Sequence, residues 1–439
     1  MESRVIQKVF RRTIPLLALC YLIAFIDKTN IGFAQLGMRQ DIGIGDAAFG
    51  LGAGVFFIGY FLFEVPSNLA LARFGARTWI MRIMVSWGII VMLTALVQGS
   101  TSFAIMRFLL GAAEAGFYPG VLYYLSRWCP EQYRPRMIGM FLLANPMATI
   151  VGGPACGALL EMDGLLGLAG WQWLFIFSGL PAVLLGYVVF RYLPESPETV
   201  DWLDEDERRW LIGTLEAEQQ GKQINHTNPL KVLKEPKVLF LAAMFVAYPT
   251  AAYGLRLWLP TLIEAFEVSD FTNGLLNAVP FIFAALGLWA WPRFISRGKN
   301  VYPHLLITAL IGAAGLCATA ATANPVWQMV FLSVAAFGLF SGEPLYWSIP
   351  SRILVGANAA AGLALINSIG NLGGFIGPWS VGLIRENTGH LEFGMYFLAA
   401  VLVYAGVMGI IAGLWFRKEQ ARPQQAAAAE HTSQYREQT

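Results

Sequence analysis

Twelve apolar segments constrain the fold of this chain, because each is close to the roughly 20 residues that an α-helix needs to cross a bilayer. Of the 439 residues, 56% are hydrophobic and 13% are charged, whereas soluble domains carry about 25% charged residues. A helix satisfies its own backbone groups in lipid, so the sequence predicts an all-α membrane protein with twelve transmembrane helices. The segments are 13–34, 47–71, 78–98, 102–126, 137–160, 170–192, 236–263, 273–294, 301–322, 326–350, 358–384 and 393–416.

The Lys and Arg residues indicate how these helices are oriented. If both termini are cytoplasmic, the inner loops and tails hold 25 of the 30 Lys and Arg residues. The outer loops then hold only Arg39 and Arg385. Cytoplasmic loops of membrane proteins carry such an excess, so the distribution predicts cytoplasmic N- and C-termini.

A long hydrophilic stretch between the sixth and seventh segments divides the chain into two halves. We expect a six-helix bundle over 1–192, a cytoplasmic linker with an amphipathic helix over 193–235, and a second six-helix bundle over 236–419. The tail 420–439 is polar and rich in Ala and Gln, a composition typical of disorder.

The two halves share a weak internal repeat. Gly152–Gly157 in the fifth segment is similar to Gly373–Pro378 in the eleventh, and the loop Arg73–Arg77 is similar to Arg293–Arg297. Two similar halves of this kind are typical of secondary transporters, whose substrate site lies between the halves near the midplane.

The sequence gives no support to several other classes of protein. Its four cysteines and four histidines form no CxxC, HxxxH or HxxEH pattern, so we expect no metal site. It contains no GxxxxGK[ST] and no GxSxG motif, so we expect neither a nucleotide cofactor nor an enzyme. A net charge of +2 is too small to suggest a nucleic-acid partner.

Charged residues inside the apolar segments are the strongest functional signal. Arg107 and Glu114 are seven residues apart, nearly two helical turns, so both side chains leave from one face of a helix. Charges at membrane depth are costly and mark substrate or ion pathways. The seven ionisable residues at this depth are Asp27, Lys28, Glu64, Arg107, Glu114, Arg256 and Glu343.

Four motifs spread over most of the first to eleventh segments: Phe25-Ile-Asp-Lys-Thr-Asn-Ile-Gly-Phe33, Gly59-Tyr-Phe-Leu-Phe-Glu-Val-Pro-Ser-Asn68, Arg107-x6-Glu114-Ala-Gly-Phe-Tyr-Pro-Gly120 and Leu365-Ile-Asn-Ser-Ile-Gly-Asn-Leu-Gly-Gly374. Together they resemble the major facilitator superfamily and, within it, the anion:cation symporter family. The resemblance implies proton-coupled import of a small organic carboxylate across the bacterial inner membrane. It also implies a multi-pass protein that works as a monomer in the lipid bilayer.

Two positions depart from the family pattern. The superfamily's loop motif Gly-x-x-x-Asp-Arg-x-Gly-Arg is present only as Asn68-x-x-x-Ala72-Arg73-Phe-Gly75-Ala-Arg77, without its Asp. Family members usually carry Asp-Arg in the first segment, where this chain has Asp27-Lys28. Lys lacks the planar fork of Arg, so we expect a differently aimed contact to an anion there.

The charged residues divide into anion-binding and proton-carrying candidates. Arg107 is the candidate anchor for a substrate carboxylate, and the alternative is a structural ion pair with Glu114 or Asp27. Glu114 and Asp27 are the candidate proton carriers, since burial away from water favours the neutral carboxyl. The alternative is that they stay ionised as partners of Arg107 and Lys28. Lys28 could contact the anion or neutralise Asp27.

Further residues are assigned to the site with less support. Arg256 could meet a second acidic or polar group on the substrate, or could pair with Glu343 across the C-terminal bundle. Glu64 is interpreted as a structural or gating carboxylate. Uncharged positions that match the family's substrate contacts are Tyr60, Asn145, Trp347, Ser351 and Asn367.

The sequence therefore predicts a proton-coupled symporter for a sugar acid or hydroxy acid, with protons and a small organic anion as its partners. Two alternatives remain open. The substrate could be an aromatic carboxylate, or the protein could be an exchanger or uniporter without proton coupling.

Overall fold

The structure, a computed structural model, describes residues 1–220, 235–295, 300–354 and 359–437, and within this part all regular elements are helices. The N-terminal bundle consists of α1 (Glu2–Asp41), α2 (Asp46–Phe74), α3 (Ala76–Thr94), α4 (Ser100–Glu114), α5 (Phe117–Ser126), α6 (Arg134–Leu142), α7 (Ala144–Leu160) and α8 (Gly170–Tyr192). After α9 (Glu205–Gln220), the C-terminal bundle consists of α11 (Pro236–Glu264), α12 (Asp270–Phe294), α13 (Val301–Ala321), α14 (Pro325–Trp347), α15 (Pro350–Ile353), α16 (Ala359–Asn371), α17 (Gly373–Thr388) and α18 (Glu392–Glu437).

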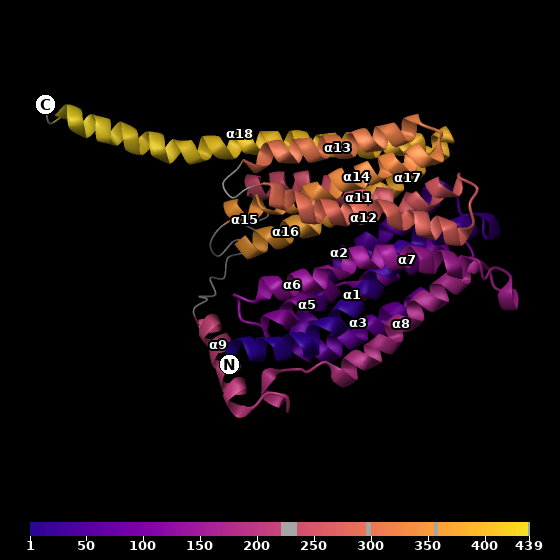
Figure 1. The fold of residues 1–439 in the computed structure, drawn as a ribbon, viewed down its shortest axis with the longest axis horizontal. Coiled ribbons are helices and arrows are strands. Elements are labelled where there is room, and N and C mark those ends of the chain that lie inside the picture. Colours follow the sequence, from indigo (N-terminus) through magenta and orange to yellow (C-terminus); the bar gives the residue numbers. More distant parts are fainter. Residues whose placement is uncertain (221–234, 296–299, 355–358, 438–439) are drawn as a thin grey trace.

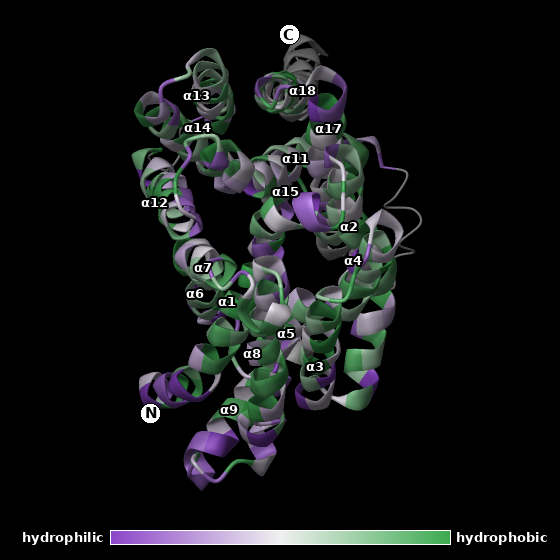
Figure 2. Ribbon diagram, turned by 90° about the vertical axis from the view of Figure 1, so that its right-hand side faces the viewer, coloured by the Kyte–Doolittle hydropathy of each residue, from purple (hydrophilic) through white to green (hydrophobic). Residues whose placement is uncertain are grey.

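The twelve predicted spans are present in the fold. Ten helices are long and apolar enough to cross a membrane. The two remaining spans each consist of two shorter helices placed end to end, α4 with α5 and α16 with α17. Figure 2 shows mainly hydrophobic colouring along both bundles, with hydrophilic residues gathered in α9 and at the start of the chain.

Interruptions occur at corresponding places in the two halves. The fourth span breaks between α4 and α5, the fifth between α6 and α7, the tenth between α14 and α15, and the eleventh between α16 and α17. At the first break Gly116 has φ of +88°, a left-handed conformation that glycine adopts without strain. At the α14–α15 break, Pro350 supplies no N–H to continue the helix. Interrupted helices in matching positions are typical of the binding region of transporters.

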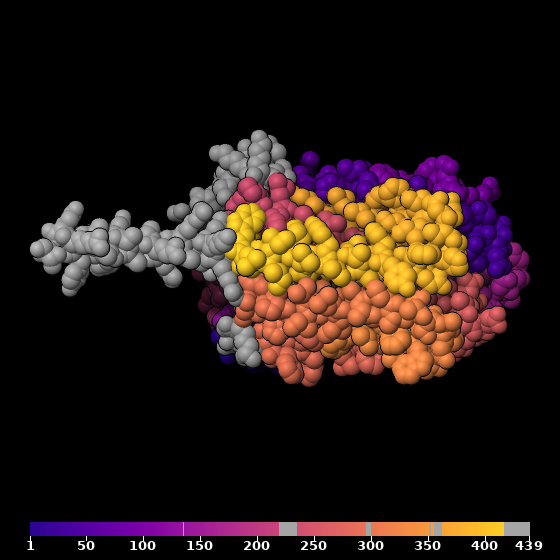
Figure 3. Space-filling view, turned by 90° about the horizontal axis from the view of Figure 1, so that it is seen from above, coloured from indigo at the N-terminus to yellow at the C-terminus, as the bar shows by residue number. Residues whose placement is uncertain are grey.

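The two bundles lie side by side (Figure 1), and the most extensive contacts between them are those of α2 with α17, α7 with α12, and α1 with α11. Glycines allow these helices to approach closely. A Cβ added to Gly153 of α7 would lie 2.5 Å from the carbonyl oxygen of Gly274 in α12. A Cβ added to Gly50 of α2 would lie 2.5 Å from the carbonyl oxygen of Pro378 in α17. On the opposite side of the C-terminal bundle, α13 and α18 form the face seen in Figure 3.

At the outer ends the bundles are joined by two matching contacts. Glu386 near the end of α17 accepts a hydrogen bond at 2.8 Å from the backbone N–H of Ala47, in the first turn of α2. Glu161 at the end of α7 accepts one at 3.2 Å from the N–H of Phe271, in the first turn of α12. Each half thus gives a carboxylate to a helix N-terminus of the other half, where free N–H groups and the helix dipole favour negative charge.

A second group of contacts closes the same end. Asp46 of α2 accepts hydrogen bonds from Gln35 of α1 at 3.0 Å and from Arg385 of α17 at 3.2 Å. The Gln35 side chain accepts a further bond from Thr261 of α11 at 2.9 Å. These bonds link both bundles through partly or fully buried groups, so the structure represents a state whose outer end is shut.

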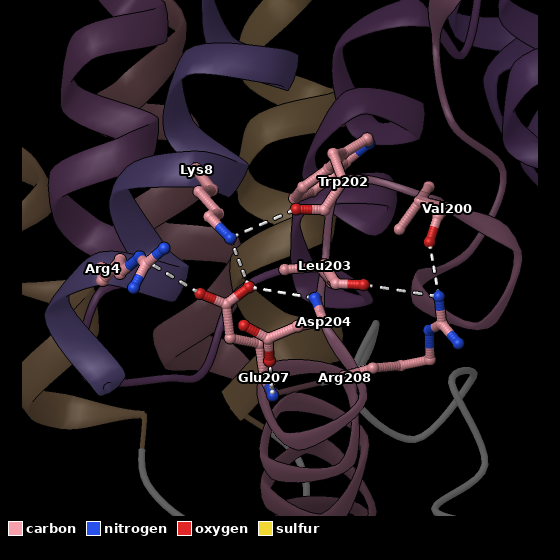
Figure 4. A network of polar contacts seen from close by, with 8 residues as sticks. All are labelled: Arg4, Lys8, Val200, Trp202, Leu203, Asp204, Glu207 and Arg208. Atoms are coloured by element: carbon pink, nitrogen blue, oxygen red, sulfur yellow. Dashed lines mark hydrogen bonds and ion pairs between the residues drawn. The ribbon is translucent and has the colours of Figure 1, made fainter.

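The linker helix α9 is attached to the N-terminal bundle. Figure 4 shows Glu207 of α9 accepting a hydrogen bond from the Lys8 ammonium at 2.5 Å and pairing with Arg4 at 3.5 Å. Glu207 is buried, and Lys8 also donates to the carbonyl of Trp202. Much of the segment 193–235, its residues 221–234, lies outside the described residues.

The last helix differs from the expectation for the tail. The structure continues α18 to Glu437, so the backbone is helical through most of the segment 420–439, for which the composition predicts disorder. Ala, Gln and Glu all have high helix propensity, which favours continuation of a helix already begun. The end of α18 projects beyond the two bundles (Figure 1).

The glycine crossings predict a specific defect. In Gly153→Ala the new methyl group would meet the backbone of α12, and overpacking of this kind costs about 1–3 kcal/mol. We expect a lower uptake rate per folded molecule because the outer end closes less readily. The control is Gly139→Ala in α6, where a Cβ meets nothing within 4 Å. Equal uptake by the two variants would contradict the role given to this crossing.

Candidate functional site

A cavity lies between the two bundles, near the middle of the helices that form it. In this state the cavity is small, with about 20 Å³ open to the centre of a water-sized sphere, which is room for roughly one water molecule. Helices of both bundles contribute, namely α1, α2 and α4 from the first and α11 and α17 from the second. The lining residues are Lys28, Ile31, Ala53, Phe56, Phe57, Arg107, Tyr253, Arg256, Leu257 and Pro378.

Lys28 forms the one ion pair found at this cavity among the described residues. Its ammonium nitrogen lies 2.6 Å from Oε1 of Glu114, which is the last residue of α4 before the break at Gly116. The same ammonium faces the rings of Phe25, Phe56 and Tyr60 at 5.1, 5.8 and 5.5 Å from their centroids. The sequence left open whether Lys28 neutralises Asp27. In the structure Lys28 neutralises Glu114 instead.

Arg107 faces the cavity without a direct ion pair to any described residue, and Asp27 and Glu114 attract it only from longer range. It is only 3% exposed, and its guanidinium carbon lies 4.9 Å from the centroid of the Phe56 ring. Its Nε has no hydrogen-bond partner, and no ion pair of Arg107 occurs in the described part of the chain. A pair with Glu114 or Asp27 is thus not formed. A buried cation without a partner is costly, which favours a role in binding an anion.

Arg256 is placed similarly on the other side of the cavity. It is 7% exposed and lies 5.5 Å from the Phe25 ring, 5.1 Å from Phe281 and 5.9 Å from Tyr253. Its Nε has no hydrogen-bond partner. Within the described residues, Arg256 and Glu343 do not form an ion pair, although Glu343 is half-buried on the neighbouring α14.

Asp27 is turned into the N-terminal bundle. Its Oδ2 accepts a hydrogen bond from the Trp87 indole at 2.7 Å, and its Oδ1 accepts one from Asn30 at 3.4 Å. Asn30 in turn donates to Ser178 of α8 at 2.8 Å. Asp27 is 2% exposed and is not among the residues that line the cavity. Its neighbours donate hydrogen bonds without carrying charge.

Tyr60, Asn145, Trp347 and Asn367 are not among the described residues that line the cavity. Tyr60 faces Lys28, Asn145 lies at the start of α7 next to the break, and Trp347 packs against Phe245 at 4.7 Å between ring centroids. Asn367 lies in α16. Ser351 lies in α15, and its side chain is outside the described residues.

Glu64 forms a contact between the bundles. Its Oε2 accepts a hydrogen bond from Ser368 of α16 at 3.2 Å. The contact joins α2 to the C-terminal bundle through the half of α2 that leads toward the cytoplasm, a position that fits the gating role expected from the sequence.

Sequence reasoning missed the aromatic wall of the cavity, formed by Phe56, Phe57 and Tyr253. Phe57 and Tyr253 touch across the bundles, with ring centroids 4.5 Å apart. The sequence has 30 Phe and 15 Tyr residues, so composition gave no signal to single these out. These residues are distinguished by their position where α2 meets α11, and that position depends on how the two halves pack together.

A family model described as Major Facilitator Superfamily matches residues 17–378. The chain belongs to the major facilitator superfamily. It is therefore a multi-pass transporter of the bacterial inner membrane and not an enzyme, as the sequence predicted.

Several relatives match along nearly the whole chain. A protein of Acinetobacter baumannii named a quinolone resistance transporter is 48% identical, with 93% of this chain and 95% of the relative covered. A protein of Agrobacterium vitis named as a tartrate transporter is 45% identical, with 94% and 92% covered. The inner membrane transport protein RhmT of Escherichia coli is 38% identical, with 85% and 87% covered.

Solved structures show the same fold. A bacterial homologue of the lysosomal transporter Spinster, in an inward-facing and unoccupied conformation, has a TM-score of 0.77 at 18% identity, covering 93% of this chain and 98% of its own. A D-xylose–proton symporter has a TM-score of 0.72 at 16% identity, covering 90% and 96%. The prediction of twelve transmembrane helices in two six-helix bundles is confirmed.

Among the described residues Lys28 has an ion-pair partner and Arg107 has none, so replacing each of them should have opposite effects on stability. Arg107→Met removes a buried charge that has no partner, so we expect the ligand-free protein to become more stable by about 1 kcal/mol or more. Lys28→Met leaves the Glu114 carboxylate buried and unpaired, so we expect a loss of about 3–5 kcal/mol. Thermal unfolding in detergent without ligand measures both. Destabilisation of similar size in both variants would show that Arg107 has a structural partner.

Proposed function

We propose that this transporter imports a small organic carboxylate, such as a sugar acid or hydroxy acid, together with protons. The observation that carries the proposal is the cavity between the bundles, where two buried guanidinium groups face the same space and neither forms an ion pair among the described residues. Guanidinium binds carboxylate through two parallel, charge-assisted hydrogen bonds. Relatives named for tartrate transport support an organic anion.

Coupling to protons is assigned to the Lys28–Glu114 pair. An anion that enters the cavity attracts the Lys28 ammonium, which now holds Glu114 at 2.6 Å. A buried carboxylate released from its cation takes up a proton more readily, because burial disfavours the charged form. Binding of the anion and of a proton thus favour each other, as symport requires.

Asp27 is proposed as the second proton carrier. Its hydrogen bonds come from Trp87 and Asn30 and not from a cation, so it can be neutralised without breaking an ion pair. Its position between α1 and α3 connects its protonation to the packing within the N-terminal bundle.

Alternating access is proposed to use the contacts already described. The outer end is shut by the carboxylates Glu161 and Glu386 and by the bonds around Asp46. Rocking of one bundle against the other would break this set and expose the cavity to the outside. One chain supplies both sides of the cavity, so a monomer is sufficient.

Arg107→Ala should abolish substrate binding. Loss of one partner of a buried, hydrogen-bonded charge pair costs about 2–5 kcal/mol, which corresponds to a fall in affinity of roughly 30-fold or more. The measurement is a thermal-shift screen of the purified protein with sugar acids, hydroxy acids and aromatic acids, since ligand binding raises the apparent stability. An affinity close to that of the unmodified protein would remove the anchor assignment.

Glu114→Gln should separate exchange from accumulation. The amide keeps the size of the side chain but cannot carry a proton, so counterflow of labelled substrate in proteoliposomes should persist while uptake driven by an inward proton gradient is lost. Accumulation equal to that of the unmodified protein would show that Glu114 is not an essential carrier. Uptake by the unmodified protein that ignores an imposed pH gradient would instead favour an exchanger or uniporter.

One observation favours the alternative of an aromatic carboxylate. The 48% identical relative is named for quinolone resistance, and quinolones are aromatic carboxylic acids. The wall of Phe56, Phe57 and Tyr253 could accommodate a ring. Including a quinolone and a simple aromatic acid in the thermal-shift screen separates this alternative from the hydroxy-acid proposal.

A further inference from the structure

We propose that the substrate is a dianion with two carboxylate groups, one held by Arg107 in the N-terminal bundle and the other by Arg256 in the C-terminal bundle. This inference rests on the proposed function as an organic-anion transporter and specifies the class of anion. It gives Arg256 the role of determining specificity.

The pairing of charges at the cavity is the first argument. Three cations line it, Lys28, Arg107 and Arg256. Glu114 forms an ion pair with Lys28 at 2.6 Å, whereas Asp27 accepts hydrogen bonds from the uncharged side chains of Trp87 and Asn30. Asp27, Glu114 and Glu343 attract the two guanidinium groups only from longer range, so Arg107 and Arg256 have no direct ion pair among the described residues.

A monoanion could pair with only one of these two guanidinium groups. The other would stay buried without a partner in the bound state, and such a charge is costly at membrane depth. A dianion pairs with both guanidinium groups. Its second carboxylate therefore adds binding free energy that an uncharged hydroxyl group in the same position would not supply.

The geometry places the two guanidinium groups on opposite sides of one space. Arg107 extends from α4 over the Phe56 ring, and Arg256 extends from α11 over the rings of Phe25 and Phe281. Neither Nε has a hydrogen-bond partner although both side chains are more than nine-tenths buried. Both residues line the same cavity, so a molecule that touches both spans the interface between the bundles.

The rest of the lining offers little else to a polar substrate. Among the described lining residues other than the three cations, Tyr253 is the one whose side chain carries a hydrogen-bonding group, and the others are aliphatic, aromatic or proline. A polyhydroxylated monoacid would find few partners for its hydroxyl groups there. The lining therefore favours recognition by carboxylates at two ends, with an apolar or lightly substituted middle.

The same arrangement links binding to the movement of the bundles. A dianion held by both Arg107 and Arg256 contacts both bundles, so its binding energy is available to hold the halves together. Two proton carriers, Glu114 and Asp27, can balance the two negative charges of such a substrate.

Two pairs of probes that differ by one carboxylate test the inference. L-Threonate has the carbon chain of L-tartrate with a CH₂OH in place of one carboxylate, and benzoate lacks one carboxylate of phthalate. Binding to the purified protein is measured by thermal shift and by competition for uptake. For whichever pair of probes binds, we expect the affinity for the dianion to exceed that for the monoanion by at least about tenfold. The monoanion lacks one carboxylate and therefore forms one buried charge pair fewer.

Arg256→Gln should reduce the affinity for the dianion to that for the monoanion and leave the affinity for the monoanion unchanged. The matched control is Arg293→Gln, which removes an exposed arginine in the last turn of α12 that is not among the residues lining the cavity. It should keep the full preference for the dianion. The ratio in the unmodified protein tests the inference even if Arg256→Gln does not fold.

The possible results are distinguishable. Equal affinity for both members of each pair, or an equal loss for both members in Arg256→Gln, would overturn the assignment of a dianion while leaving an organic-anion transporter. Absence of binding and uptake for all four carboxylates would overturn the proposed function itself.

Discussion

The cost of an unpaired charge in a membrane interior governs the arrangement of this protein. Water cannot solvate a guanidinium group at the centre of two packed bundles, so each such group needs a carboxylate or a ligand. Lys28 has Glu114 as its partner. Arg107 and Arg256 lie against aromatic rings and form no ion pair among the described residues, and the buried carboxyl groups of Asp27, Glu114 and Glu343 act on them only from longer range. An anionic substrate in the cavity they share would supply the direct contacts that they lack.

At the closed outer end, carboxylates supply the partners that buried N–H groups need. Free N–H groups at the starts of α2 and α12 would be unsatisfied if they were covered by apolar side chains. Glu386 and Glu161 satisfy them from the opposite bundle. Because the repeat places α7 and α17, and α2 and α12, in equivalent positions, one type of contact occurs twice. In an open state the same groups would be free to form hydrogen bonds with water.

Much of the architecture could be predicted from the sequence, because lipid imposes simple rules on segment length and on loop charge. The twelve spans and their orientation came from this information, and the presence of charged residues such as Arg107, Glu114 and Lys28 inside apolar segments made them candidates for the site. The partners of the charged residues could not be predicted. Arg107 and Glu114 share a helix face, yet Glu114 pairs with Lys28 of α1. Asp27 is adjacent to Lys28 in sequence but turns toward Trp87, since consecutive residues on a helix point about 100° apart.

The sequence by itself determined the number of helices, their direction through the bilayer and the presence of buried charges, because each depends on local composition and on the cost of moving polar groups into lipid. The tertiary structure alone decided which charges are neutralised and which remain available. Ion pairs need atoms within a few ångströms of one another, and here those atoms belong to helices that are distant in sequence. The same holds for the wall of Phe56, Phe57 and Tyr253, which exists only where the two halves meet.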